Sequence, residues 1–377
     1  MNYEIRQFDE AVLRFSSDSG AENNIRVLWV HEDKSKLPLD LSGVSDSDVW
    51  NWLRNRTVPR NRAYVDTLLT AIGVSPNRQM DIINASKGLS LNDCYWVTEE
   101  GFDGSFDKYN LYDNPFSRVL GLIAFSGYGS NTINGMTSSP EFTTNGILPK
   151  CWRRENGIKL YKGGTEGASN TGNEPYSEFY AYQVGAELGF NVLPYKLSKW
   201  KGKLCSVCDI FTSKELSYVP IGRIIKSGGL KAVREFYASL GDEFVNSLNE
   251  MIIFDAVIFN TDRHFGNFGV LVNSKTNKIV SPAPLFDHGN SLFNLAGRDA
   301  LESDAGMKRY ADVLLPCVYD SFVDEAKKNL THIQRNSLRK LLDFKFKKHS
   351  RYNLSQSRLS LIEKRIHNRV RELISDK

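Results

Sequence analysis

The segment from Phe254 to Phe293 constrains this chain more than any other part of its sequence. Its letters are FDAVIFNTDRHFGNFGVLVNSKTNKIVSPAPLFDHGNSLF. Asp262 and Asn267 stand five residues apart, and Asp287 follows after a run that is typical of a β-hairpin. Asp and Asn are common in turns, so each residue alone is explained by a loop. Their combination around one hairpin instead predicts that the chain folds back and gathers the three polar side chains at one site.

Such a set of side chains suits phosphoryl transfer. This chemistry needs a group that orients or deprotonates the nucleophile, oxygen ligands for a metal, and a cation on the phosphates. Asp262 and Asn267 have the spacing of the catalytic-loop aspartate and the metal-binding asparagine of protein kinases. Asp287 has the place of the second metal ligand, and carboxylate and carboxamide oxygens are ligands that Mg²⁺ accepts.

The phosphate-binding cation is predicted in the stretch IKLYKGG. Lys162 ends a predicted strand before a glycine-rich loop, and the alternation of the strand places it on the apolar face. Lys159 is the alternative. Glu178, in the first turns of the following helix, is the expected ion-pair partner, and Glu174 is a less favoured one. Solvated surface charges would explain the same residues.

Composition places the chain among ordinary globular proteins. Of its 377 residues, 41% are hydrophobic and 24% are charged, which does not favour disorder. We expect a cytoplasmic protein without a membrane span, because no apolar run approaches 18 residues and the first ten residues lack a hydrophobic signal core.

Five cysteines argue against a disulfide scaffold. Cys205 and Cys208 form a C-x-x-C motif within an alternating apolar pattern, which predicts a strand. A metal or redox site is the alternative, but no second pair follows at zinc-site spacing. Charge is uneven, since residues 321–377 contain 15 Lys and Arg against 6 Asp and Glu. We interpret this basic stretch as a solvated helix face, with a nucleic acid or acidic partner as the alternative.

Residues 1–115 are predicted to form an N-terminal accessory α/β region with strands near AVLRFSS and IRVLWVH and two helices. Four arginines lie between these helices and admit a helix-turn-helix that contacts DNA, although two neighbouring tryptophans favour a packed domain. The arginines are Arg54, Arg56, Arg60 and Arg62.

Residues 116–215 are predicted to be rich in β-structure, with a hairpin at RRENG, one helix from Pro175 to Gly189, and strands near 192–197 and 203–212. Residues 216–377 are predominantly helical and end in a helix whose apolar residues recur every three or four positions. This order predicts an α+β, bilobed protein-kinase-like fold, with a β-rich N-lobe at 116–215 and a helical C-lobe at 216–377.

The motif N-x-D-R-H-x-x-N followed by D-x-G resembles the HipA-like serine/threonine kinases, a bacterial family that includes toxins of toxin–antitoxin pairs. Further segments between about residues 88 and 293 resemble the same family in order. They are LSLNDCYWV, SSPEFTTNG, LYKGG, EPYSEFYAYQVGAELGFNVLPY and CSVCDIFTSKELSYVP. The Asp-Arg-His-x-x-Asn part is shared with phosphoinositide kinases.

The resemblance implies an ATP- and Mg²⁺-dependent kinase with assigned residues. Asp262 would be the catalytic base, His264 would brace the catalytic loop, and Asn260 would support its entry. Asn267 and Asp287 would bind Mg²⁺. The nucleotide would be contacted by a further set from the N-lobe and hinge: Lys162, Glu178, Ser138, Ser139, Cys208 and Phe211.

Family members phosphorylate themselves in the loop that corresponds to GMTSSPEFTTNG, which implies the same for Ser138 or Ser139. A phosphoserine adds negative charge that would repel ATP, so we expect modification to inhibit the enzyme. The partners implied are a protein substrate of unknown identity and an antitoxin, with nucleic acid contacted only indirectly and no membrane. Two alternatives stay open: a small-molecule or phosphoinositide kinase, and a non-catalytic nucleotide-binding or DNA-contacting module.

Overall fold

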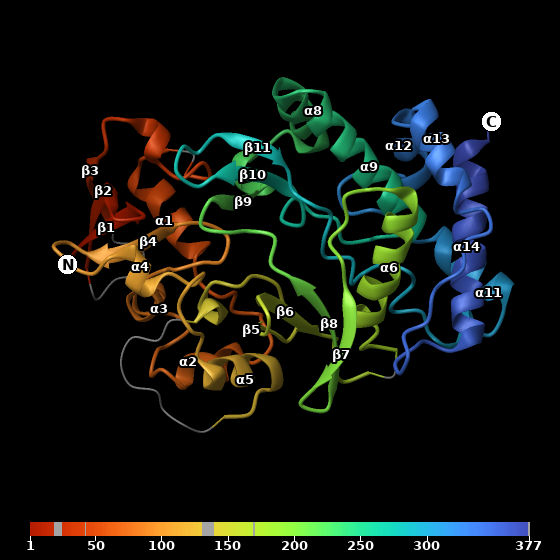
Figure 1. The fold of residues 1–377 in the computed structure, drawn as a ribbon, viewed down its shortest axis with the longest axis horizontal. Helices are drawn as coiled ribbons and strands as arrows, with labels where there is room; N and C mark the ends of the chain where they lie inside the picture. The colour runs from red at the N-terminus through yellow and green to blue at the C-terminus, as the bar shows by residue number, and fades with distance from the viewer. Residues whose placement is uncertain (19–24, 42, 130–138, 169, 376–377) are drawn as a thin grey trace. The chain divides into compact units, whose positions relative to one another are not determined.

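The computed structural model describes residues 1–18, 25–41, 43–129, 139–168 and 170–375 (Figure 1). Its contacts divide the chain into two compact units. The first comprises Met1–Lys162, Asp209–Val219 and Val270–Val280, and the second comprises Gly163–Cys208, Pro220–Gly269 and Ser281–Lys377. The predicted division at residues 115 and 215 is drawn on the sequence alone and stays a prediction.

The first unit begins with an antiparallel sheet of order β3-β2-β1-β4. Its strands are β1 (Asn2–Gln7), β2 (Glu10–Ser17), β3 (Ile25–Val30) and β4 (Tyr95–Glu99). The helices of this unit are α1 (Asp46–Arg54), α2 (Val65–Thr70), α3 (Gln79–Ser86), α4 (Phe106–Tyr109) and α5 (Arg118–Ser126). Both predicted strands and both predicted helices are therefore present.

Helix α1 packs its apolar face onto this sheet because Val49, Trp52 and Leu53 are all buried in one cluster with sheet residues. A capping box fixes its start: the Ser45 side chain accepts from the backbone N–H of Asp48, and the Asp48 carboxylate accepts from that of Ser45. Of the two neighbouring tryptophans, Trp52 is buried in this cluster and Trp50 is partly buried against it.

The first unit also contains the predicted hairpin of β5 (Lys150–Arg154) and β6 (Ile158–Gly163). Asn156 and Gly157 have positive φ values of 49° and 111°, which suit the tight turn between the strands. A three-stranded sheet of order β11-β10-β9 completes this unit. It contains β9 (Leu216–Pro220), β10 (Gly269–Asn273) and β11 (Ile279–Pro282), and β10 with β11 is the hairpin predicted after Asn267.

The second unit is built around α9 (Asp242–Ile258), whose residues 251–258 are all buried. Helices α6 (Glu174–Leu188), α8 (Gly229–Leu240), α12 (Phe322–Lys328) and α14 (Gln356–Ile374) all contact α9 (Figure 1). The other helices are α7 (Ile221–Ile224), α10 (Arg298–Leu301), α11 (Asp304–Asp312) and α13 (His332–Arg339). The five apolar residues predicted to form one face of the last helix are buried: Leu359, Ile362, Ile366, Val370 and Leu373.

Strands β7 (Lys196–Trp200) and β8 (Lys203–Asp209) form an antiparallel pair. Cys205 and Cys208 are buried within β8, which confirms the strand. The strand predicted at 192–197 is displaced, because Pro194 has no N–H to donate to a ladder. Val192 instead makes an isolated parallel bridge with Leu285, and β7 begins at Lys196.

Candidate active site

The loop that bears Asp262 begins where α9 ends. Phe259 adopts the left-handed conformation, with φ of 55°, and Asn260 donates its backbone N–H to the Asp255 carbonyl at 3.0 Å. The buried Asn260 side chain donates to Asp255 Oδ1 at 2.9 Å and accepts from the Asp262 N–H at 3.2 Å. These bonds turn the chain sharply and leave Asp262 half-buried on the loop.

Arg263 holds this loop to the segment that contains Asp287. Its Nε and Nη2 donate to the two oxygens of Asp255, at 2.9 and 3.1 Å. Nη1 donates to the carbonyl of Asn267 at 2.9 Å and to that of Phe286 at 2.6 Å. One nitrogen therefore binds the backbone of both segments predicted to carry metal ligands.

His288 accepts the remaining bond of Arg263, because its Nδ1 lies 3.0 Å from Nη2 and a guanidinium only donates. All five N–H groups of the guanidinium are thereby used. Burial opposes the charge of Arg263, but the Asp255 carboxylate outweighs it and raises the pKa of the guanidinium. The side chain therefore stays charged in the interior.

The base of the β10–β11 hairpin brings the segment that contains Asp262 close to the segment that contains Asp287. The Ala283 N–H donates to the Gly269 carbonyl at 3.0 Å. Asn290 donates its side-chain amide to Asp262 Oδ2 at 2.9 Å and accepts from the Asn294 amide at 3.1 Å. Asn290, which follows the hairpin, thus orients the carboxylate of Asp262, which precedes it.

Asn267 and Asp287 carry side-chain oxygens of the kind that bind Mg²⁺. Asn267 is buried, and its side-chain amide donates to the Asp262 carbonyl at 3.1 Å. Among the described residues, no hydrogen bond is made to its Oδ1. Asp287 has φ of 58°, and its backbone N–H donates to the Tyr195 hydroxyl at 3.2 Å. No group of three or more His, Cys, Asp or Glu suited to a metal occurs in the described ranges. Two protein oxygens nevertheless fit Mg²⁺, which binds through few carboxylates together with substrate phosphates.

Glu178 lies against the segment that contains Asp287. Its side chain is 1% exposed, and a Cβ built on Gly289 would lie 3.7 Å from its Oε1. Burial raises the pKa of the Tyr195 hydroxyl well above its ordinary value, and the nearby charges of Glu178 and Asp287 add to this. Glu174 has another role, because its carboxylate accepts from the backbone N–H and the hydroxyl of Thr165.

His264 is exposed, and its Nδ1 accepts from the backbone N–H of Gly266 at 3.0 Å, which closes the turn between Asp262 and Asn267. Cys208 is buried at the end of β8 in the second unit. The second unit therefore contains Asp262, Asn260, His264, Asn267, Asp287, Glu178 and Cys208.

The other predicted residues belong to the first unit. Lys162 is 5% exposed at the end of β6, whereas Lys159 pairs with Asp209. Phe211 is half-buried and packs edge-to-face on Tyr218, with ring centroids 5.4 Å apart. Ser139 is 3% exposed, and Ser138 lies outside the described residues.

Sequence reasoning assigned no role to Arg263, Asp255, Asn290 or Tyr195. A signal existed for the first two: Asp255 interrupts the apolar run MIIFDAVIF, and a carboxylate inside an apolar helix needs a buried cation. Asn290 and Tyr195 carry no local signal, because only the tertiary fold brings them to the loop.

Comparisons with known proteins show which known fold this chain resembles. No protein-family model matches the chain. A segment of 135 residues is 27% identical to the serine/threonine-protein kinase CtkA of Helicobacter pylori, covering 32% of this chain and 41% of that protein. The match thus spans less than half the length of this relative.

Two solved structures resemble the fold of this chain. The crystal structure of the Helicobacter pylori proinflammatory kinase CtkA matches with a TM-score of 0.50 and 17% identity, over 61% of this chain and 90% of that one. HipA of Shewanella oneidensis MR-1, solved in complex with HipB and operator DNA, matches with a TM-score of 0.59 and 13% identity, over the full length of both chains.

The chain has the fold of the HipA-like kinases. This confirms the resemblance seen in the sequence and the predicted α+β, kinase-like class. The relation to CtkA agrees with it.

Replacing Arg263 by Met should lower the free energy of unfolding by about 3–5 kcal/mol, because it leaves the Asp255 carboxylate buried without its cation. Urea denaturation followed by circular dichroism measures this. The exposed Arg298 of α10 provides the control, and Arg298→Met should change the value by less than about 0.5 kcal/mol. Equal stability of the two variants would contradict the structural role of Arg263.

Proposed function

We propose that this chain is an ATP- and Mg²⁺-dependent serine/threonine protein kinase of HipA-like type. The observation that carries the proposal is the arrangement around Arg263 and Asn290. Arg263 binds the backbone beside both proposed metal ligands, and Asn290 orients the carboxylate of Asp262. The sequence match to the kinase CtkA supports the reaction class.

Asp262 is the proposed general base. It would accept the proton of a substrate hydroxyl as the hydroxyl oxygen attacks the γ-phosphorus of ATP. The bond from that phosphorus to the bridging oxygen breaks, and ADP leaves. Asn290 donates to Oδ2 of Asp262, and we propose the other oxygen, Oδ1, as the proton acceptor.

Asn267 Oδ1 and the Asp287 carboxylate are the proposed Mg²⁺ ligands. The bound ion would neutralise charge on the β- and γ-phosphate oxygens. Lys162 is the proposed phosphate contact and Glu178 its partner, while backbone groups near Cys208 and Phe211 would bind adenine. Lys159, the alternative, pairs with Asp209.

A protein substrate and an antitoxin are proposed as partners. The antitoxin proposal rests on the fold shared with HipA of Shewanella oneidensis, whose structure contains HipB and operator DNA. Substrate choice depends on surface residues and does not transfer with a fold. Among the residues that the structure describes, no helix is long and apolar enough to cross a bilayer.

Replacing Asp262 by Ala should reduce phosphoryl transfer at least about 100-fold, because a general base contributes factors of this size. Transfer of label from γ-³²P-ATP to the protein itself and to casein measures it, with phosphatidylinositol vesicles as a separate acceptor. Asp299→Ala, at an exposed carboxylate of α10, is the control and should keep wild-type transfer. Transfer of label to the vesicles alone would identify a lipid kinase. Wild-type transfer by the Asp262→Ala variant would contradict the assignment of Asp262 as the general base.

Asn267→Ala and Asp287→Ala should each abolish most of the increase in ATP affinity that Mg²⁺ causes, because each removes one oxygen ligand. Calorimetric titration of ATP with and without MgCl₂ measures this increase. Asp299→Ala again serves as the control. Variants that kept the full increase would exclude the assigned residues as ligands.

Incubation with Mg-ATP should add a phosphate to Ser138 or Ser139 and weaken ATP binding. Because the Ser139 hydroxyl is buried, modification of this residue requires its segment to open first. Peptide mass spectrometry of residues 137–144 identifies the site, and ATP titration of the separated phosphorylated form gives its affinity. An active preparation without phosphate on this peptide, or a modified form with unchanged ATP affinity, would refute self-inhibition.

A further inference from the structure

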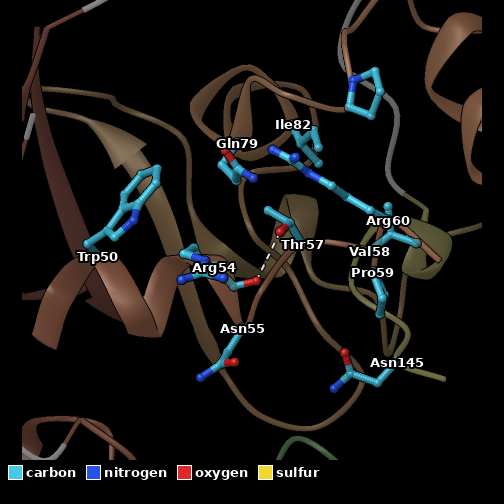
Figure 2. A pocket seen from close by; sticks show the side chains of 11 residues that line it. Trp50, Arg54, Asn55, Thr57, Val58, Pro59, Arg60, Gln79, Ile82 and Asn145 are labelled. Atoms are coloured by element: carbon cyan, nitrogen blue, oxygen red, sulfur yellow. Dashed lines mark hydrogen bonds between the residues drawn. The ribbon is translucent and has the colours of Figure 1, made fainter. Parts of the chain in front are cut away.

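A pocket of about 570 Å³ lies in the first unit, beside the C-terminal end of α1 (Figure 2). This volume is within the range of small-molecule sites. Its lining includes Trp50 and Arg54 from α1, Arg60 from the following loop, Gln79 from the start of α3, and Asn145. Neither the proposed catalytic residues nor the proposed metal ligands line it.

The charge of the pocket is positive. Arg54 and Arg60 both line it and both are exposed, and none of the described lining residues carries a carboxylate. In Figure 2 the Arg60 side chain extends from the Pro59 side towards Gln79. Arg54 in the last turn of α1 could merely offset the helix dipole. Arg60 lies beyond the helix, so the dipole does not account for a second guanidinium on the same pocket.

Neighbouring arginines show the contrast. Arg56 is buried and donates to both oxygens of Asp93, at 2.8 and 2.9 Å. Arg62 is buried and pairs with Glu141 at 3.0 Å. These two arginines are buried in the unit, whereas Arg54 and Arg60 are exposed and line the pocket.

The remaining lining combines amides with apolar surface. Gln79 and Asn145 provide hydrogen-bond donors and acceptors at the pocket. Trp50 contributes a half-buried indole ring, and Val58 and Ile82 contribute buried aliphatic side chains. Guanidinium groups bind phosphate with paired hydrogen bonds, and an indole face stacks on flat rings. The lining therefore suits a molecule that has a phosphate at one end and a flat ring at the other.

We propose that this pocket is a binding site for a small phosphorylated compound with a flat ring, of the nucleoside monophosphate class. Arg54 and Arg60 bind the phosphate, Trp50 stacks on the ring, and the amides bind its polar edge. The site is independent of the proposed kinase reaction.

Binding at this site also restrains the segment that follows Ser139. Asn145 lines the pocket, and its carbonyl accepts from Lys150 Nζ at 2.9 Å. The carbonyl of Thr144 accepts from Arg62 at 3.2 Å. A ligand that contacts Asn145 therefore slows amide hydrogen exchange in residues 143–150.

Calorimetric titration of the full chain with AMP, GMP, CMP and UMP tests the proposal. At least one should bind with 1:1 stoichiometry and slow exchange in residues 143–150, and its nucleoside or inorganic phosphate alone should bind at least ten-fold more weakly. Arg54→Gln and Arg60→Gln should each weaken binding about ten-fold or more, since each loses a hydrogen bond to a charged group. Arg26→Gln, at an exposed arginine of β3, should leave it unchanged.

Asp287→Ala separates this pocket from the proposed ATP site. Unchanged monophosphate binding in this variant supports a second site. Binding lost in Asp287→Ala but kept in both arginine variants would assign the ligand to the ATP site and overturn the proposal. Absence of binding by all four monophosphates would also overturn it, as would binding of duplex DNA alone that depends on Arg54 and Arg60.

Discussion

Asp255 and Arg263 form a buried ion pair, and the geometry of the candidate active site depends on it. Both side chains are almost completely excluded from solvent, so neither charge is tolerated without the other. The planar guanidinium has further N–H groups in fixed directions, and these reach the carbonyls of Asn267 and Phe286. The requirement to neutralise one carboxylate in α9 therefore also fixes two loops that are about 20 residues apart in the chain.

As a consequence, the polar side chains of the site are oriented by hydrogen bonds from neighbouring residues. Asn260 closes the end of α9, Asn290 binds one oxygen of Asp262, and Asn294 binds Asn290. Each bond restricts a rotamer before any substrate arrives. This preorganisation is what phosphoryl transfer requires, because the protein contributes chiefly by positioning reactants and stabilising charge. The proposed function follows from this arrangement together with the relation to CtkA.

The accessory region shows how one residue type takes two roles within nine positions. The stretch from Arg54 to Arg62 contains four arginines, which the sequence presents as one basic cluster. In the fold, Arg56 and Arg62 are buried in ion pairs, while Arg54 and Arg60 line a pocket. Two of the four arginines thus stabilise the domain, and the other two are proposed to bind a phosphorylated ligand.

The sequence alone indicated many of the elements and proposed the candidate residues of the site. Alternation and turn residues located β2, β3 and the β5–β6 and β10–β11 hairpins, and the spacing of Asp262, Asn267 and Asp287 indicated their chemistry, because these signals act over a few residues. Tertiary structure alone decided which groups support them. Tyr195 reaches the Asp287 backbone across about 90 positions, and Glu141 neutralises Arg62 across 79. Such partners are selected by burial and charge neutralisation in three dimensions, and no local pattern in the chain records them.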